Sequence, residues 1–110
     1  MTLTLNLPPV LVEYFSAQNA HDIDRLVACF AEDAKVRDEG EDIVGRDKIR
    51  EWKEKTSAKY KVTVQPLRIA EVDGHHSVTA KVSGTFPGSP VELTYTFGLR
   101  DGLIATLAVH

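Results

Sequence analysis

The second half of the chain contains three hairpin turn signals, and these constrain its fold more than any other feature. The signals are Asp73-Gly74, Pro87-Gly88-Ser89-Pro90 and Arg100-Asp101-Gly102. Asp-Gly suits a two-residue turn because both residues tolerate a positive φ. In Pro-Gly, the proline has a fixed φ and the glycine can adopt a positive φ. Stretches of alternating apolar and polar residues flank each turn. The pattern predicts a four-stranded antiparallel meander with strands at about 61–72, 75–86, 91–99 and 103–109.

The first part of the chain has helical patterns instead. A helix is predicted from Pro8 or Pro9 to about Asn19, because proline is favoured in a first helical turn. Asp22 is a good N-cap for a short second helix. The inner face of that helix is expected to carry Ile23, Leu26, Val27 and Phe30.

A short strand, a loop and a third helix are predicted between these helices and the meander. The strand is Ala34 to Asp38, the acidic loop runs over 39–42, and the helix runs roughly from Asp47 to Ser57 with Ile49 and Trp52 inward. The succession predicts a single α+β domain over residues 1–110. Three N-terminal helices would pack on a strongly curved, mainly antiparallel sheet and enclose a pocket.

The two faces of the predicted meander differ in character. The inward face carries Val91, Leu93, Tyr95, Phe97 and Leu99 in the third strand, and Leu103, Ala105, Leu107 and Val109 in the fourth. The outward face carries Thr79, Ser83, Thr85, Thr94, Thr96, Ile104, Thr106 and Ala108, with Lys81 and Glu92 as its main charges. A solvated sheet face usually carries more charge, so we expect this surface to form a homodimer interface.

Charge and composition limit the expected partners. The net charge of −3 argues against a nucleic-acid partner, which usually meets a basic face. No apolar run approaches the roughly 18–20 residues of a membrane-spanning helix, and residues 1–6 lack the regions of a secretory signal. The single cysteine, Cys29, excludes an internal disulfide and fits a reducing cytoplasm. We therefore expect a cytoplasmic protein that contacts neither nucleic acid nor a membrane.

Three short sequence segments indicate a family. They are Tyr14-Phe15 with Asn19-Ala20-His21-Asp22-Ile23-Asp24, Cys29 through Val36, and Gly45-Arg46-Asp47-Lys48-Ile49-Arg50. The chain resembles the SnoaL-like and ketosteroid-isomerase-like proteins of the nuclear transport factor 2-like superfamily over about residues 10–109. The resemblance implies an α+β cone with a deep pocket. The superfamily includes isomerases, dehydratases, epoxide hydrolases, polyketide cyclases and proteins without a catalytic role.

The resemblance assigns Asp38 to the position of the isomerases' general-base aspartate. Asp38 lies two residues after Val36 on a predicted strand, so both side chains share a face. In an apolar pocket a carboxylate gains basicity, and it could remove a proton next to a carbonyl. The alternative is that Asp38 begins the acidic loop and is solvated.

Two tyrosines are the expected hydrogen-bond donors. Tyr14 matches the family's donor on the first helix, although it also lies on the apolar stripe of that helix and could belong to the core. The isomerases add a protonated aspartic acid from the third meander strand. Here Tyr95 stands at that place, and a phenol donates a hydrogen bond without carrying charge.

The remaining reactive residue types receive plainer interpretations. None of the four histidines has a ligand partner at metal-binding spacing, so no metal is predicted. No glycine-rich phosphate loop follows a strand, so no cofactor is predicted. Cys29 is expected to be a small buried hydrophobe. The basic stretch 46–61 is interpreted as a solvated helix face with an ion pair between Glu51 and Lys55.

Three functions remain open from the sequence. The first is proton transfer on a hydrophobic carbonyl compound, of isomerase or cyclase type, with Asp38 as base and Tyr14, helped by Tyr95, as donor. The second is non-catalytic binding of a small apolar ligand. The third is an interaction domain that uses the outer sheet face. The expected ligand-binding walls are Phe15, Trp52, Leu93, Phe97 and Leu107.

Overall fold

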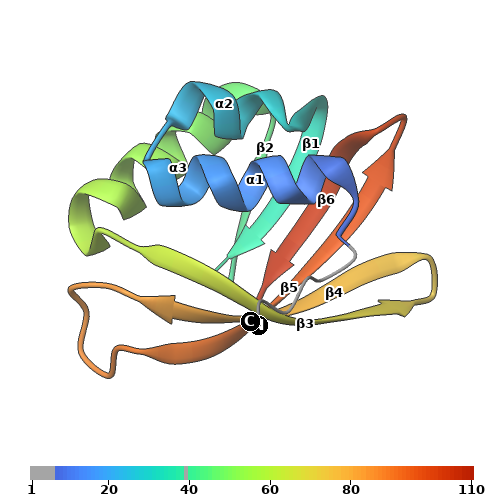
Figure 1. Cartoon of the computed structure of the whole chain (residues 1–110). Helices are drawn as coiled ribbons and strands as arrows, with labels where there is room; N and C mark the ends of the chain where they lie inside the picture. Colours follow the sequence, from blue (N-terminus) through green and yellow to red (C-terminus); the bar gives the residue numbers. More distant parts are fainter. Residues whose placement is uncertain (1–6, 39) are drawn as a thin grey trace.

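The computed structural model describes residues 7–38 and 40–110, so the predictions made for residues 1–6 and for Glu39 lie outside the described residues. Helices and strands follow one another in the order shown in Figure 1. They are α1 (Pro9–Ala20), α2 (Ile23–Ala28), β1 (Phe30–Asp38), β2 (Glu41–Val44), α3 (Arg46–Tyr60), β3 (Thr63–Val72), β4 (His75–Ser83), β5 (Val91–Arg100) and β6 (Leu103–Val109). The described chain is thus an α+β fold.

The six strands form one sheet in the order β2-β1-β6-β5-β4-β3. Neighbouring strands are antiparallel except β1 and β6, which are parallel. The predicted meander is confirmed as β3 to β6. Its two Asp-Gly turns have left-handed φ values, 50° and 77° at Asp73 and Gly74 and 53° and 78° at Asp101 and Gly102. These are the backbone conformations that such residue pairs favour.

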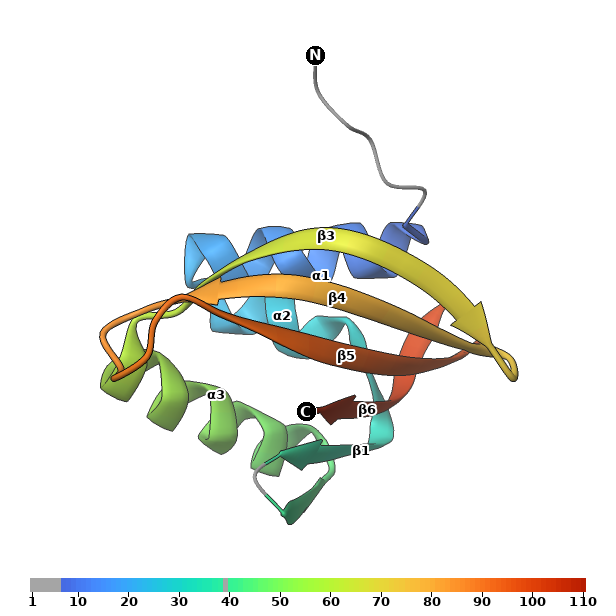
Figure 2. The same ribbon diagram turned by 90° about the horizontal axis from the view of Figure 1, so that it is seen from below.

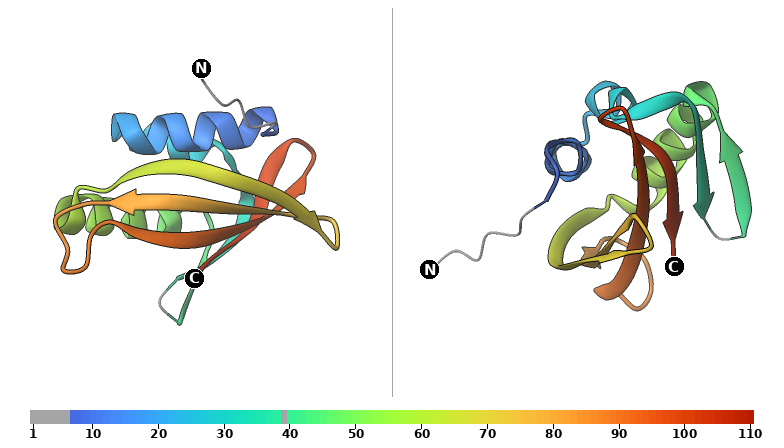
Figure 3. Two further views of the ribbon diagram at one scale, coloured as in Figure 1. Left: turned by 60° about the horizontal axis from the view of Figure 1, so that its bottom comes forward. Right: turned by 90° about the vertical axis from the view of Figure 1, so that its right-hand side faces the viewer.

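The three helices lie on one side of the sheet, which bends around them (Figures 1 and 3). Figure 2 shows β3, β4 and β5 arching past α1, while α3 lies beside β1. Two predicted helix starts are confirmed, at Pro9 and after Asp22. The Asp22 carboxylate accepts a hydrogen bond from the backbone N–H of Arg25 at 3.2 Å, as an N-cap residue should.

The segment after α2 differs from its prediction. Phe30 begins strand β1 rather than completing the inner face of α2, and β1 is four residues longer at its start than the predicted Ala34–Asp38. Two residues of the predicted acidic loop, 41 and 42, belong instead to β2 and pair with Asp38 and Arg37. The physical reason is that β1 pairs on both edges, with β2 and with the distant β6, and such long-range pairing outweighs local propensity.

Strand β6 also departs from the predicted alternation. Ile104 was expected on the outer face, yet its side chain is fully buried. The register of β5 with β6 shifts between Gly98 and Leu99, so the residues near the turn change face. A Cβ on Gly98 would collide with Oγ1 of Thr106, so any larger residue here would displace the Thr106 side chain.

Aromatic side chains form the centre of the core between α1 and the sheet. Tyr14 has its ring 5.2 Å from Phe15, 5.9 Å from Phe30 and 5.4 Å from Phe97, each in an edge-to-face arrangement. Such pairs prefer this geometry because the ring edge is positive and the face negative. The cluster fixes α1 over β1 and β5. Within residues 7–38 and 40–110, none of the helices has the length and apolar character that crossing a bilayer requires.

Candidate functional site

A cavity of about 370 Å³ lies between α3, the end of α1 and one end of the sheet. Most of its walls are apolar side chains, and a few polar groups converge on it, as is typical of small-molecule sites. Its lining residues are Gln18, Asp38, Trp52, Lys53, Thr56, Val62, Val82, Phe86, Pro87, Val91, Leu93, Tyr95 and Val109.

Asp38 is the carboxylate of this cavity. It is the last residue of β1, and the alternation of that strand buries Val36 and exposes Arg37. The Asp38 side chain is half-buried, lines the cavity and accepts a hydrogen bond from Nε1 of Trp52 at 2.9 Å. The structure therefore places Asp38 at the cavity wall and not in a solvated loop, with an indole N–H that fixes the orientation of its carboxylate.

Tyr95 is the phenol of the same cavity. It comes from β5, is 6% exposed and lies on the face that also carries Phe97. Burial raises the pKa of the Tyr95 hydroxyl, and the nearby Asp38 carboxylate raises this pKa further. Tyr95 is thus a neutral hydrogen-bond donor at physiological pH, placed in the same cavity as a carboxylate.

Lys53 lines the same cavity, although its place in the basic stretch 46–61 predicted a solvated side chain. It is only 7% exposed. Its Nζ donates a hydrogen bond to Oε1 of Gln18 at 2.5 Å and lies 4.4 Å from the centre of the Trp52 ring. Burial lowers the pKa of Lys53 to about 8, although Asp38 acts in the opposite direction. A signal was present, since residues 49, 52, 53 and 56 have the spacing of one helix face.

Tyr14 does not line the cavity. Its side chain is fully buried among aromatic rings, and its hydroxyl makes no hydrogen bond to any residue that the structure describes. Burial raises the pKa of Tyr14 well above its ordinary value. The structure therefore places the expected family donor in the core behind the cavity wall.

Tyr14→Phe is expected to leave the free energy of unfolding unchanged or to raise it by about 1 kcal/mol, because an unpaired buried hydroxyl costs stability. Urea denaturation followed by circular dichroism measures the change. A decrease of more than about 1 kcal/mol would show that the hydroxyl has a partner such as a bound water.

The predicted ligand-binding walls divide into two groups. Trp52 and Leu93 line the cavity. Phe15, Phe97 and Leu107 are buried and do not line it. Phe15 and Phe97 pack instead against the Tyr95 ring, with centroids 5.7 Å and 6.2 Å away. Phe15 from α1 and Phe97 from β5 therefore pack against the Tyr95 ring on its core side. The inward face of β5 thus contributes both to the core, through Phe97, and to the cavity, through Tyr95.

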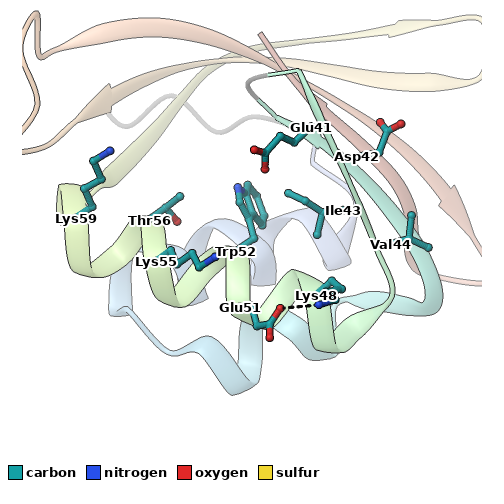
Figure 4. Close-up of a pocket in the computed structure, with 10 residues that line it drawn as sticks. All are labelled: Glu41, Asp42, Ile43, Val44, Lys48, Glu51, Trp52, Lys55, Thr56 and Lys59. Carbon is teal, nitrogen blue, oxygen red and sulfur yellow. Dashed lines mark ion pairs between the residues drawn. The ribbon is translucent and has the colours of Figure 1, made fainter.

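A second hollow of about 620 Å³ lies between β2 and α3 (Figure 4). Its lining residues are Glu41, Asp42, Ile43, Val44, Lys48, Glu51, Trp52, Lys55, Thr56 and Lys59. Most of these side chains are exposed, and Glu51 forms an ion pair with Lys48 at 3.3 Å in place of the expected pair with Lys55. Exposed charges of both signs line this hollow, whereas the walls of the first cavity are mainly apolar.

The histidines and the cysteine are not among the residues that line the first cavity. His21 and His75 are exposed, and the main chain of His110 pairs with that of Thr94. Cys29 is buried as predicted, and burial raises the pKa of its thiol to about 11. Among the residues with described positions, no group of three or more histidine, cysteine or acidic side chains could hold a metal ion.

Solved structures share this architecture. A Sinorhizobium meliloti protein named "putative polyketide cyclase" is 38% identical, with a TM-score of 0.93 over 99% of this chain and 100% of that one. A Catenulispora acidiphila protein with a ketosteroid isomerase-like fold, solved with trimethylamine, is 21% identical, with a TM-score of 0.83 over 96% and 86% of the two chains. An epoxide hydrolase/cyclase-like enzyme of salinomycin pyran ring formation, SalBIII, is 23% identical, with a TM-score of 0.78 over 91% and 85%.

Sequence comparison identifies the family. No curated protein matches the chain. A model of the SnoaL-like domain matches residues 11–107, which include every element from α1 to β6 in whole or in part. The chain therefore belongs to the SnoaL-like domain family, within the nuclear transport factor 2-like fold.

Proposed function

We propose that this protein binds a small hydrophobic carbonyl compound and moves a proton next to its carbonyl group. The observation that carries the proposal is that Asp38 and Tyr95, from β1 and β5, line one cavity whose other walls are mainly apolar. In this proposal the cavity is the pocket expected of the family's cone, and Tyr95 takes the donor role that the sequence analysis gave first to Tyr14.

The chemistry follows from the two groups. The Asp38 carboxylate removes a proton from the carbon next to the carbonyl, and negative charge develops on the carbonyl oxygen. The Tyr95 hydroxyl donates a hydrogen bond to that oxygen, which stabilises the charge most where water is excluded. Asp38 then returns the proton to the same or another carbon. The Trp52 N–H holds the carboxylate in place at 2.9 Å, so little ordering is needed at the reaction step.

The relatives support a reaction of this type. Removal of a proton beside a carbonyl is the first step of an intramolecular aldol cyclisation, and the 38% identical relative carries a polyketide cyclase name. Isomerisation of an unsaturated ketone begins with the same step. Both reactions use one base and one neutral hydrogen-bond donor. The geometry therefore supports this class of reaction, and the structure of the bound compound determines which product forms.

The test measures hydrogen exchange on a simple ketone. β-Tetralone is small enough for a cavity of about 370 Å³, and the hydrogens beside its carbonyl exchange slowly without catalyst. In deuterium oxide the protein should accelerate loss of these proton signals in NMR spectra. Shifts of the Trp52 and Tyr95 resonances without faster exchange would show binding alone and favour the non-catalytic binder. The proposal would be contradicted if β-tetralone caused no shifts and its hydrogens exchanged no faster.

We also propose that two copies of the chain associate through the outer face of the sheet. Thr79, Thr94 and Thr96 are half-buried there, and the exposed charges include an ion pair between Arg68 and Glu92 at 3.2 Å. Light scattering should give twice the chain mass of 12.2 kDa. Thr79→Arg should lower this mass toward one copy, whereas Ala58→Arg, on exposed α3, should not. A single-copy mass for the unmodified protein would overturn this interface.

A further inference from the structure

Among the described residues that line the first cavity, Lys53 carries the only amino group. It enters from α3 and is 7% exposed. Three contacts hold its Nζ: a hydrogen bond to Oε1 of Gln18, the Trp52 ring with its centre 4.4 Å away and the Tyr14 ring with its centre 5.6 Å away. The amine is therefore kept at a defined place on the wall of an apolar cavity.

The surroundings of this amine favour reaction as a nucleophile. Burial lowers the pKa of Lys53 from 10.5 to about 8, whereas exposed lysines stay mostly protonated at neutral pH. Only the neutral amine has a free electron pair, and at pH 7 its population is expected to exceed that of an exposed lysine on the order of a hundredfold. Buried lysines of this kind are the ones that form Schiff bases.

We propose that Lys53 forms an imine with hydrophobic aldehydes and ketones that enter the cavity. The Nζ electron pair forms a bond to the carbonyl carbon, and the oxygen takes the proton that the nitrogen loses. The carbon–oxygen bond of this carbinolamine then breaks, the oxygen leaves as water after taking a second proton, and the nitrogen loses its remaining proton. Amine and carbonyl compound thus give imine and water, with no oxidant or reductant.

The charged and titratable groups that face Lys53 across the cavity can carry these protons. Asp38 comes from β1 and Tyr95 from β5. On α1, Gln18 is neutral, and Tyr14 presents its ring to Nζ at 5.6 Å. The Tyr95 hydroxyl donates toward the carbonyl oxygen as it becomes a hydroxyl group, and the Asp38 carboxylate accepts the proton released from the nitrogen. The inference shares the cavity with the proposed function but goes beyond it, because imine formation removes no proton from carbon.

Reductive trapping tests this inference on the whole chain. Naphthaldehyde is a suitable probe because it is apolar and has no hydrogen on the carbon next to its carbonyl, so it cannot report on proton abstraction from carbon. With cyanoborohydride, which delivers hydride to the imine carbon, the protein should gain a stable secondary amine. Intact mass should show one adduct per chain, and peptide mapping should place it on Lys53.

Two variants and a pH series sharpen the test. Lys53→Arg keeps a positive charge and should lose the adduct, while Lys48→Arg, on the exposed face of the same helix, should keep it. Between about pH 6 and about pH 9 the initial labelling rate should rise roughly tenfold or more and level off, following the neutral amine. Asp38→Asn should slow labelling, because the amide cannot accept the proton that the nitrogen releases, and it should shift this rise to lower pH, because Asp38 raises the pKa of Lys53.

Two results would overturn the inference. One is label spread over exposed lysines with Lys53 unmodified in the unaltered protein, which decides the question even if a variant fails to fold. The other is an unchanged adduct in Lys53→Arg. Labelling of Lys53 together with no exchange on β-tetralone would support the imine site and contradict the proposed function, so the two failures are distinguishable.

Discussion

Asp38→Asn is expected to reduce the rate of hydrogen exchange on β-tetralone by about 10²–10⁴-fold, the range for loss of a positioned general base. The amide is nearly isosteric with the carboxylate but cannot take up a proton at neutral pH. Its oxygen can still accept the hydrogen bond from Trp52 that the carboxylate accepts at 2.9 Å. The fold and the cavity should therefore persist while the chemistry is lost.

A matched control is Asp47→Asn, because this aspartate is exposed in the first turn of α3 and does not line the cavity. The Asp47→Asn protein should catalyse hydrogen exchange on β-tetralone at the rate of the unaltered protein. Binding of β-tetralone, followed by its effect on Trp52 fluorescence, should change little in Asp38→Asn. Equal exchange rates in both variants would remove Asp38 from the role of base.

Lys53→Met is expected to raise the free energy of unfolding at pH 7 by about 1–3 kcal/mol, because each unit of lowered pKa corresponds to about 1.4 kcal/mol. Lys53 titrates near 8 in the folded protein against 10.5 as its ordinary value, so at neutral pH folding buries a charge at a cost. Methionine has a similar length and no charge. Loss of the hydrogen bond to Gln18 offsets part of the gain.

The sign of the pH dependence follows from the same shift. The unfolded chain binds more protons at Lys53 than the folded chain does between about pH 8 and 10.5, so this residue makes stability rise with pH in that window. Tyr14, Tyr95 and Cys29 act in the opposite direction, because their pKa values are raised in the folded protein. The contribution of Lys53 is therefore isolated only in the difference in free energy of unfolding between Lys53→Met and the unaltered protein.

Urea denaturation of Lys53→Met and of the unaltered protein, from pH 7 to about pH 10, measures this difference. The advantage of the variant should shrink as the pH rises, because the lysine in the unaltered protein becomes neutral. Lys48→Met, at an exposed position, should show neither the gain nor the trend. A variant less stable than the unaltered protein at pH 7 would show that the contacts of the charged amine outweigh its burial.

Local signals in the sequence predicted most of the fold. The Asp-Gly and Pro-Gly pairs defined the hairpins of β3 to β6, and the prolines and Asp22 defined the starts of α1 and α2. These signals work because turns and caps depend on the φ preferences and side-chain hydrogen bonds of a few adjacent residues. The prediction missed the first four residues of β1 and all of β2. Strand β1 pairs with β2 and also with β6, and the second pairing joins segments about 70 residues apart.

The site was predicted less completely than the fold. The alternation of β5 predicted Tyr95 on the inward face, and that of β1 put Asp38 on the face of Val36 while a solvated Asp38 stayed open. The division of the inward face between cavity and core was not visible, so Phe15, Phe97 and Leu107 were assigned to walls that they do not form. Lys53 was missed because a charged residue is normally solvated, and its Nζ contacts Gln18 of α1, a residue 35 positions away in the chain.

The sequence by itself determined the helices, the meander and the family, because short-range backbone preferences and apolar periodicity specify elements and their inward faces. Tertiary structure alone decided which inward side chains meet an open cavity, and it brought Asp38, Lys53 and Tyr95 from three elements to the lining of one cavity. The reason is that burial, and with it the pKa of Lys53, depends on how distant segments pack around a group rather than on its neighbours along the chain.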